Sequence, residues 1–193
     1  MNIGIIGGGF TGLTAAYRLS RLGHNVTVLE REDTVGGMAH GWKEPKWSWT
    51  LETTYHHLFT NDKAIISLCR DLGISHTLRR YSPHTDTYIR GKSYPLDSAR
   101  GLLAFSPIPL FDRLRTGAMI AACKLVPWYG FLTDKTARDV FLPLGGKNGW
   151  NAIWHPLMVG KFGDMADTIA ASWLWARIHK RTPSLLYPDG GFT

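Results

Sequence analysis

Residues 2–12 read Asn-Ile-Gly-Ile-Ile-Gly-Gly-Gly-Phe-Thr-Gly, and this stretch decides the fold of the chain that follows. Residues 2–6 have the apolar composition of a short buried strand, and residues 10–22 carry apolar side chains at helical spacing. Gly23 ends that helix, and residues 25–30 read as a second buried strand, parallel to the first. The sequence therefore predicts a βαβ unit with a glycine-rich loop between its first strand and its helix.

The loop satisfies the pattern G-x-G-x-x-G, and its candidate binding residues are Gly7, Gly9, Phe10, Thr11 and Gly12. The first glycine permits a tight turn, the second lets the backbone approach a pyrophosphate, and the third lets helix and strand pack closely. Backbone N–H groups at the start of the helix then face the phosphates, and the helix dipole favours their negative charge. This arrangement predicts that the loop binds a dinucleotide.

An acidic residue, Glu30, closes the unit at the end of the second strand, about 20 residues after the loop. At that place a carboxylate can accept hydrogen bonds from a ribose hydroxyl of adenosine, and it repels a ribose 2′-phosphate. A solvated acid at the end of a strand is the structural alternative.

A glycine pair, Gly36–Gly37, follows the acid after a short turn. This order resembles that of the two-dinucleotide-binding-domain flavoproteins, in which the turn passes near the phosphates of FAD; a plain Gly-Gly turn is the alternative. Residues 2–37 as a whole resemble the FAD-binding start of the flavin amine oxidase superfamily, which includes protoporphyrinogen oxidases, phytoene desaturases and monoamine oxidases. The resemblance implies FAD as cofactor and adds four candidate contacts: Arg31, Gly36, Gly37 and Met38. Many members have arginine where this chain has Met38, which weakens an amine oxidase assignment.

Residues 51–63 occupy the place where such flavoproteins bring the chain past the isoalloxazine ring. The resemblance gives four possible contacts to flavin or substrate: Thr54, Tyr55, His56 and His57. Neighbouring side chains of an extended segment point in different directions, so we expect at most one of the two histidines to face the ring. Structural histidines are the alternative, and a metal site is not expected because no recognisable ligand set accompanies them. Residues 55–63 also resemble a segment of UDP-galactopyranose mutases, which implies chemistry on a nucleotide sugar as a second interpretation.

The remainder of the chain changes from a sheet-forming to a mainly helical pattern near residue 95. Before that point the sequence predicts a strand over 47–52, a helix over 62–72 and a hairpin over 79–94 that turns at Gly91-Lys92. After it, helices are predicted over residues 98–105, 110–126, 136–142, 150–159 and 167–180. The predicted organisation is an α/β fold: a Rossmann-like FAD-binding region over 1–95, followed by a mainly helical, partial substrate domain over 96–193.

Two features of the helical region have two interpretations each. Four tryptophans either form a core or line a pocket for an extended apolar substrate: Trp150, Trp154, Trp173 and Trp175. Residues 110–126 are apolar on more than one side and have basic flanks, so they predict either a buried helix or a helix on a membrane surface. Peripheral membrane contact would suit a lipophilic substrate.

Composition narrows the classes of function. The 193 residues are 44% hydrophobic and 19% charged, and no stretch is apolar for the about 20 residues that a membrane-spanning helix needs. The net charge of +7 favours anionic ligands, but no nucleic-acid-binding motif accompanies the scattered basic residues, so nucleic acid is not an expected partner. The chain starts without a signal-peptide pattern, and Cys69 and Cys123 read as reduced structural thiols. We therefore expect a cytoplasmic protein, with any membrane contact on the cytoplasmic face.

The sequence identifies no catalytic acid, base or nucleophile, which agrees with hydride transfer to a flavin, because the cofactor holds the reactive chemistry. The resemblance implies an FAD-dependent oxidoreductase of the protoporphyrinogen oxidase and phytoene desaturase type, which takes hydride from a largely apolar small molecule. A UDP-galactopyranose mutase-like flavoprotein is the alternative. Residues 187–193 resemble the point where this superfamily returns from its substrate domain to its FAD domain, which implies an N-terminal half. A non-catalytic FAD-binding half that works with a second polypeptide or a missing C-terminal half is the third interpretation.

Overall fold

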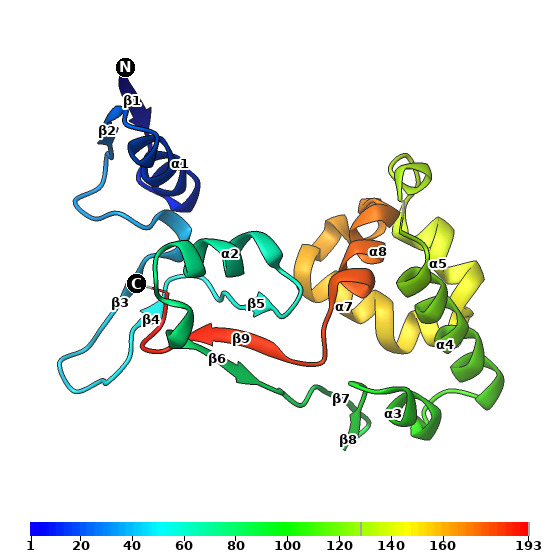
Figure 1. The fold of residues 1–193 in the computed structure, drawn as a ribbon. Helices are drawn as coiled ribbons and strands as arrows, with labels where there is room; N and C mark the ends of the chain where they lie inside the picture. Colours follow the sequence, from blue (N-terminus) through cyan, green and yellow to red (C-terminus); the bar gives the residue numbers. More distant parts are fainter. Residues whose placement is uncertain (128, 193) are drawn as a thin grey trace. The chain divides into compact units, whose positions relative to one another are not determined.

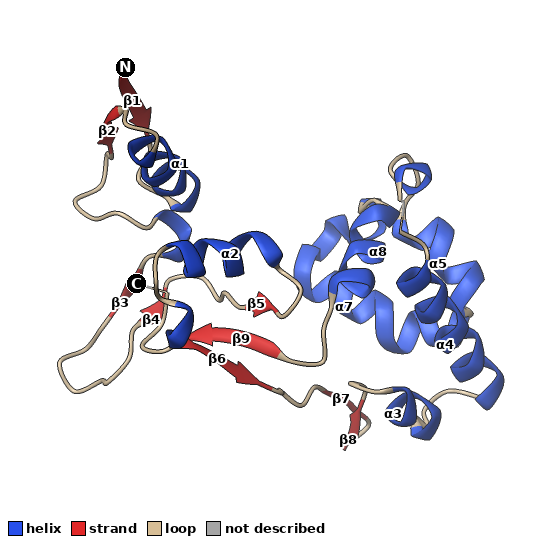
Figure 2. Ribbon diagram, in the orientation of Figure 1, coloured by secondary structure: helices blue, strands red, loops and turns tan. Residues whose placement is uncertain are grey.

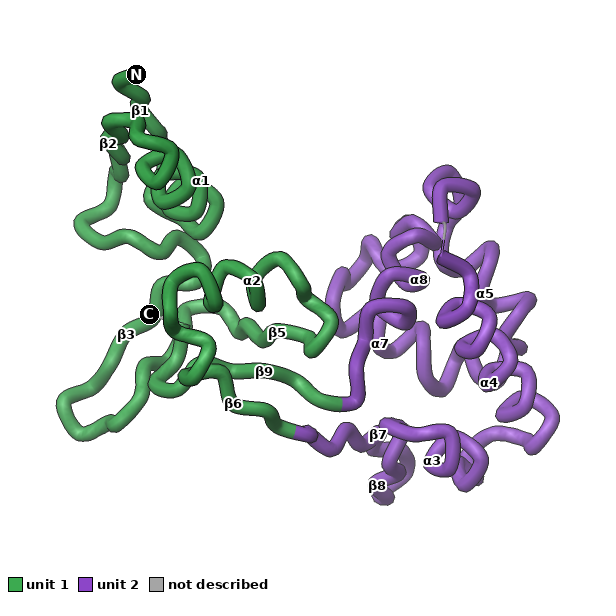
Figure 3. The backbone as a smooth tube through the Cα atoms, in the orientation of Figure 1, with its two compact units in different colours: residues 1–81, 184–193 green, residues 82–183 purple. Residues whose placement is uncertain are grey.

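The computed structural model describes residues 1–127 and 129–192, in which helices alternate with short strands (Figures 1 and 2). The chain divides into two compact units, one of Met1–Tyr81 with Ser184–Thr193 and one of Ser82–Pro183 (Figure 3). This division differs from the predicted boundary near residue 95 in two places. The hairpin before residue 95 belongs with the helices, and the end of the chain returns to the first unit. The assignment of 1–95 to the cofactor and 96–193 to the substrate stays a prediction.

The first unit begins with β1 (Asn2–Ile6), α1 (Phe10–Arg21) and β2 (Asn25–Leu29). The two strands pair in parallel, so the chain has the strand, helix, strand order that the sequence predicts. Exposed and partly buried residues alternate along both strands, and Ile6 and Leu29 keep 92% and 59% of their surface exposed. The interpretation of both strands as fully buried is therefore wrong. Within the described residues these strands form a sheet of their own, so the face opposite α1 is open.

The rest of the first unit consists of short antiparallel pairings and one helix. Its elements are β3 (Gly41–Trp42), β4 (Leu51–Glu52), β5 (Leu58–Phe59), α2 (Lys63–Asp71), β6 (Leu78–Tyr81) and β9 (Leu185–Pro188), with the 3-10 turns η1 (Gly37–Ala39) and η2 (Ser75–Thr77). β3 pairs with β4, and β9 lies between β5 and β6, antiparallel to both. The predicted helix over 62–72 is present as α2, whereas only the last two residues of the strand predicted over 47–52 pair, as β4.

The hairpin predicted over residues 79–94 is wrong in its first strand. That segment is β6, which pairs with β9 in the first unit. The hairpin itself consists of β7 (Asp86–Ile89) and β8 (Lys92–Pro95) in the second unit. It turns at Arg90 and Gly91, which have φ angles of 50° and 81°. A local pattern indicates that a segment is extended, but it does not identify a partner strand that comes far later in the chain.

The second unit is mainly helical. Its helical elements are α3 (Ala99–Ala104), α4 (Leu110–Leu125), η3 (Gly130–Leu132), α5 (Ala137–Gly145), α6 (Lys147–Gly149), η4 (Trp150–Trp154), α7 (His155–Phe162), η5 (Gly163–Thr168) and α8 (Ala171–Lys180). α5 continues past its predicted end at residue 142, through Pro143. The helix predicted over 150–159 is a π-helical segment, η4, followed by α7.

The core of the second unit packs tryptophans of η4 and α8 against side chains of α4 and α5. Trp150, Trp154 and Trp175 are 2%, 8% and 4% exposed, which confirms the core interpretation for these three. Trp173 is partly buried and packs against the ring of Phe162, with the ring centroids 4.8 Å apart. These side chains fill the unit rather than line a substrate pocket.

Both cysteines are buried free thiols, as the sequence predicts. Burial raises the pKa of Cys123 to about 11 and also raises the pKa of Cys69. A thiol with a raised pKa holds little thiolate near neutral pH, so it reacts slowly. Their role in this fold is packing.

α4 has an inner side that mixes polar residues with the core residues Met119 and Cys123, and its outer side is largely apolar. Asp112 and Thr116 are buried, whereas Phe111, Leu114 and Leu125 are 68%, 54% and 82% exposed. The prediction of a buried helix therefore holds for its inner side alone. In residues 1–127 and 129–192, no helix is long and apolar enough to cross a bilayer.

Candidate functional site

The glycine-rich loop joins β1 to α1 in a conformation that depends on its glycines. Gly7 has a φ of 102°, which residues with a side chain rarely adopt, and its N–H donates to the Leu29 carbonyl at 2.7 Å. A Cβ at Gly12 would lie 2.0 Å from the carbonyl oxygen of Gly7, so helix and loop meet where that side chain is missing. Helix geometry leaves the N–H groups of residues 10–12 for an acceptor outside the helix, such as an anion.

The second glycine pair packs directly on this loop. The N–H of Gly36 donates to the Gly8 carbonyl at 2.8 Å, and Gly9 and Gly36 form an isolated parallel bridge. A Cβ at Gly37 would lie 3.1 Å from the Cα of Gly9. Gly36 and Gly37 have φ angles of 120° and 59°, so the turn needs glycine at both positions. The structure therefore brings the two glycine clusters together, and their contact with phosphates stays a prediction.

Glu30 uses its carboxylate to hold the loop and the turn after β2. Its Oε2 accepts from the N–H of Gly8 at 2.5 Å, and its Oε1 accepts from the N–H groups of Arg31 and Glu32 at 2.7 and 3.1 Å. Hydrogen bonds from Glu32, Gly8 and Arg31 lower the pKa of Glu30 below 4.5. A carboxylate has about four acceptor positions, so Glu30 keeps capacity for a ribose hydroxyl beside this structural role.

We expect Glu30→Gln to lower the melting temperature at pH 7, because the amide offers one acceptor oxygen to three backbone donors. Since the folded pKa of Glu30 lies below its ordinary value, the contribution of the carboxylate is present above the pKa of the unfolded chain and is lost as the pH falls through the folded pKa. Melting curves of wild type and variant should therefore converge in acid, as the pH falls through the lowered pKa of Glu30. Glu32→Gln is the matched control, because its carboxylate pairs with the exposed guanidinium of Arg31 at 2.9 Å. A difference between wild type and Glu30→Gln that stays constant with pH would contradict this role.

A cavity of about 690 Å³ opens beside the loop, in the first unit. The predicted contacts that line it are Gly7, Gly9, Phe10, Thr11, Gly12, Gly36, Met38, His56 and His57. Within the described residues, the predicted contacts that lie outside its wall are Glu30, Arg31, Gly37, Thr54 and Tyr55. The fold thus gathers most of the candidate residues around one opening at the amino end of α1.

Both histidines line this cavity, although alternation along an extended segment would place only one of them there. Residues 53–57 are irregular rather than strand, which removes the alternation. The ring of His56 lies 6.0 Å from the ring of Phe192, and His57 packs edge-on against Phe59 at 5.0 Å. The Nδ1 atom of His56 is buried and has no hydrogen-bond partner within the described part of the chain. A buried polar atom without a partner is costly, so this nitrogen is a candidate to bind a ligand group.

The segment before the histidines is tied to the second glycine turn and to β9. The hydroxyl of Thr54 donates to the carbonyl of Met38 at 2.7 Å. Thr54 therefore supports a residue of the cavity wall without lining the cavity itself. Tyr55 is 74% exposed and shares a side-chain hydrogen bond with Tyr187 of β9. Burial, and then the bond to Tyr55, raise the pKa of Tyr187. Tyr55 therefore contacts the sheet, and its contact with flavin or substrate stays a prediction.

The cavity wall includes residues that sequence reasoning missed. Phe192 follows β9 and reaches the wall from the far end of the chain, where its N–H donates to Oε1 of Glu52 at 3.3 Å. No local pattern points to this contact, because it depends on the pairing of β9. Ile5 and Ala15 also line the cavity, from β1 and α1. Because both residues lie close to the glycine motif in the sequence, their place in the cavity wall could have been predicted.

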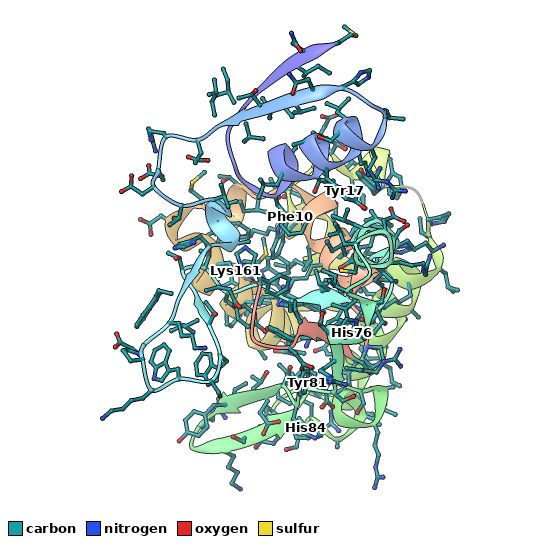
Figure 4. All side chains as sticks on the ribbon, turned by 60° about the vertical axis from the view of Figure 1, so that its left-hand side comes forward. Phe10, Tyr17, His76, Tyr81, His84 and Lys161 are labelled. Carbon is teal, nitrogen blue, oxygen red and sulfur yellow. The ribbon has the colours of Figure 1, made fainter. Side chains whose placement is uncertain are left out.

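α1 is fixed at its other end to α2. The hydroxyl of Tyr17 donates to the carbonyl of Asp71 at 2.8 Å, and Arg21 donates to the same hydroxyl at 3.3 Å. Figure 4 shows Phe10 and Tyr17 on this helix, with Phe10 near its start. These contacts hold the helix while its first turn borders the cavity.

Comparison of the sequence with known proteins gives a family. A sequence model described as flavin containing amine oxidoreductase matches residues 10–150. The L-amino-acid oxidase of Mus musculus is 33% identical over 86 residues, which are 44% of this chain and 14% of that protein. Amine oxidases and 15-cis-phytoene desaturases also match. The chain spans less than a fifth of the length of these relatives, at 14%, 19% and 16%.

Two solved structures share the fold over nearly the whole chain. A protein described as a protoporphyrinogen oxidase, from Exiguobacterium sp. 255-15, gives a TM-score of 0.64 at 18% identity, with 99% of this chain and 48% of that chain covered. Reduced UDP-galactopyranose mutase gives a TM-score of 0.68 at 19% identity, with 99% of this chain and 44% of that chain covered. At such identities the likeness shows a shared fold, and the chain spans less than half of each protein.

Proposed function

Because this chain belongs to the family of flavin containing amine oxidoreductases, we propose that it binds FAD, with the ADP portion on the glycine-rich loop. β1, α1 and β2 are then the start of a Rossmann-like domain. The observation that carries the proposal is the packing of both glycine clusters at the amino end of α1, where Gly12 touches Gly7 and Gly36 bonds to Gly8. N–H groups and the helix dipole at this place attract a pyrophosphate.

Glu30 supports FAD over a 2′-phosphorylated nucleotide. Its lowered pKa keeps the carboxylate charged at neutral pH, and its bond to the N–H of Gly8 holds it beside the loop. A charged acceptor there binds a ribose hydroxyl and repels a second phosphate. Arg31 lies next to it and pairs with Glu32 at the surface, where it is available to a phosphate as a rim contact.

The cavity beyond the loop supports a flavin or substrate position. Its wall is largely apolar, with Ile5, Leu58 and Phe192, and it includes His56, whose Nδ1 has no hydrogen-bond partner among the described residues. FAD, when bound, supplies the redox chemistry. The side chains of this chain exclude water and orient the ligand, and His56 donates or accepts one hydrogen bond. We propose an oxidoreductase of the protoporphyrinogen oxidase and phytoene desaturase type, which takes hydride from a largely apolar small molecule.

A mutase that acts on a nucleotide sugar is the second candidate, favoured by the likeness to reduced UDP-galactopyranose mutase and by residues 55–63. The two functions differ in electron balance. Isomerisation requires a prereduced flavin and leaves the substrate with no net oxidation, whereas the oxidoreductase leaves a reduced flavin. Anaerobic incubation of the reduced protein with UDP-galactopyranose distinguishes them. Formation of the ring-contracted isomer supports the mutase, and its absence rejects it.

A second segment of polypeptide is proposed to complete the protein, because the chain spans less than half of the matched structures. The outer side of α4 is a candidate contact for it. Arg113 donates to the carbonyls of Ile108 and Leu103 at 2.8 and 2.7 Å, and Lys124 donates to the carbonyls of His179 and Arg181 at 3.2 and 2.6 Å. With these cations turned to backbone carbonyls, the outer side presents apolar residues that suit a protein surface. We also propose that the protein is located in the cytoplasm, as the sequence leads us to expect.

The experiment that tests FAD binding is the visible spectrum of the purified chain after incubation with FAD and removal of free cofactor. We expect flavin bands that remain with the protein. A colourless protein that takes up no flavin would reject autonomous FAD binding. The same measurement on the chain mixed with the candidate second polypeptide then separates a missing segment from a wrong cofactor.

A further inference from the structure

The loop between β3 and β4 presents three tryptophans side by side. We call residues 42–49 the tryptophan hairpin. The ring centroids of Trp47 and Trp49 lie 5.1 Å apart with an interplanar angle of 10°, and those of Trp42 and Trp47 lie 4.9 Å apart at 42°. The rings thus stack into a ladder that begins at the end of β3 and continues into the loop between β3 and β4, whose path Figure 1 shows.

The base of the hairpin is fixed, although its loop is long. β3 and β4 pair there, and the N–H of Thr50 donates to the carbonyl of Gly190 at 2.9 Å. A turn within the loop is closed by the N–H of Trp47, which donates to the carbonyl of Glu44 at 3.0 Å. The fold therefore holds the ladder in place instead of burying it in a core.

The two outer rings of the ladder are in contact with water, and Trp47 between them is partly buried. Trp42 and Trp49 are each 47% exposed, even though each stacks on Trp47. Exposed indole surface costs free energy in water, and a cluster of it marks a contact surface rather than a chance exposure. Indole also has a polar N–H, so it suits a boundary that is apolar on one side and wet on the other.

The charges of the hairpin decide what kind of boundary fits. Lys43 and Lys46 are exposed, and within the described residues neither forms an ion pair with an acid. Glu44 is the single acid of the loop, so the hairpin carries a net positive charge. Tryptophan and lysine together are the side chains that anchor proteins at the interface of a bilayer, and lysine is attracted to anionic headgroups. The outer side of α4 differs, because Arg113 and Lys124 are held by backbone carbonyls.

We propose that the tryptophan hairpin docks the protein on an anionic phospholipid surface. The indole rings enter the headgroup region, and Lys43 and Lys46 remain at the lipid phosphates. This contact involves neither the glycine-rich loop nor α4, so it is independent of FAD binding.

Cosedimentation with lipid vesicles tests the proposal. We expect the full chain to bind phosphatidylcholine vesicles that contain phosphatidylglycerol, and to bind pure phosphatidylcholine vesicles much more weakly. The pair of changes Trp42→Ala and Trp49→Ala should reduce the partition coefficient by roughly tenfold or more, because two indole rings that are each 47% exposed no longer transfer to the lipid. Changing Lys43→Gln or Lys46→Gln should each reduce it by about fivefold, and added salt should remove that difference.

Two controls keep the experiment decisive. Tyr88→Ala removes an aromatic side chain from the β7–β8 hairpin that is more exposed than the tryptophans, at 72%, and it should leave binding unchanged. Phe111→Ala removes an exposed ring from α4 and should also leave binding unchanged. Circular dichroism spectra show whether each variant is folded.

Three results would overturn the proposal. The first is that the wild-type chain binds no vesicles. The second is that Phe111→Ala abolishes binding while the tryptophan variant retains it, which would place the membrane contact on α4. The third is self-association of the wild type in the absence of lipid that the tryptophan variant loses, which would make the hairpin an interface between copies.

Discussion

Gly12→Ala is expected to lower the affinity for FAD by about a hundredfold or more, which corresponds to the loss of roughly two charge-assisted hydrogen bonds at 1.5 kcal/mol each. A Cβ at Gly12 would lie 2.0 Å from the carbonyl oxygen of Gly7, and that oxygen belongs to backbone that cannot rotate away. The start of α1 must therefore separate from the loop. The N–H groups of residues 10–12 then no longer converge on one phosphate position. A fluorescence titration with FAD measures the loss.

Gly4→Ala is the matched control, because it adds the same methyl group to the strand that leads into the loop. Within the described residues nothing lies within 4 Å of a Cβ at Gly4. We expect FAD affinity equal to that of the wild type. If Gly12→Ala binds FAD as well as Gly4→Ala does, the loop is not the cofactor site.

Phe141→Ala is expected to lower the free energy of unfolding of the second unit by about 3–5 kcal/mol. Phe141 of α5 is 2% exposed and belongs to the core that contains Trp150 and Leu174. Truncation removes apolar contacts and leaves a cavity that neighbouring rings are too rigid to fill. Urea unfolding followed by tryptophan fluorescence measures the change, since the core holds Trp150, Trp154 and Trp175.

Leu144→Ala is the control on the same helix, because Leu144 is 56% exposed. We expect it to change the free energy of unfolding by less than about 1 kcal/mol. Equal effects of the two substitutions would mean that α5 does not pack by the face that contains Phe141.

The features that the sequence predicted well are local. The glycine motif, the helix after it and the second strand lie within 29 residues, and each depends on periodicity or on glycine chemistry. The contact between Gly36 and Gly8 could also have been predicted, because a short turn after β2 returns the chain to the end of the strand. The helices of the second unit were predicted from the spacing of their apolar residues, which is also a local feature.

The features that the sequence did not predict depend on distant partners. β9 pairs with β5 and β6, so the segment predicted as the first strand of a hairpin pairs with β9 instead. The same pairing brings Phe192 to the cavity wall beside His56. The hydrogen bonds of Glu30 were missed because a strand-end acid has the same sequence signature whether it binds backbone or ribose. The open face of β1 and β2 was missed because a continuous apolar run is typical of strands covered on both sides.

A comparison of FAD with FMN tests whether the glycine-rich loop binds the ADP portion of FAD. If the loop holds the ADP portion of FAD, which FMN lacks, the chain should bind FAD, ADP should displace it, and FMN should bind far more weakly. Equilibrium dialysis of the purified chain against each nucleotide gives all three results. Equal binding of FAD and FMN, or FAD binding that ADP does not displace, would mean that the loop does not hold the ADP portion.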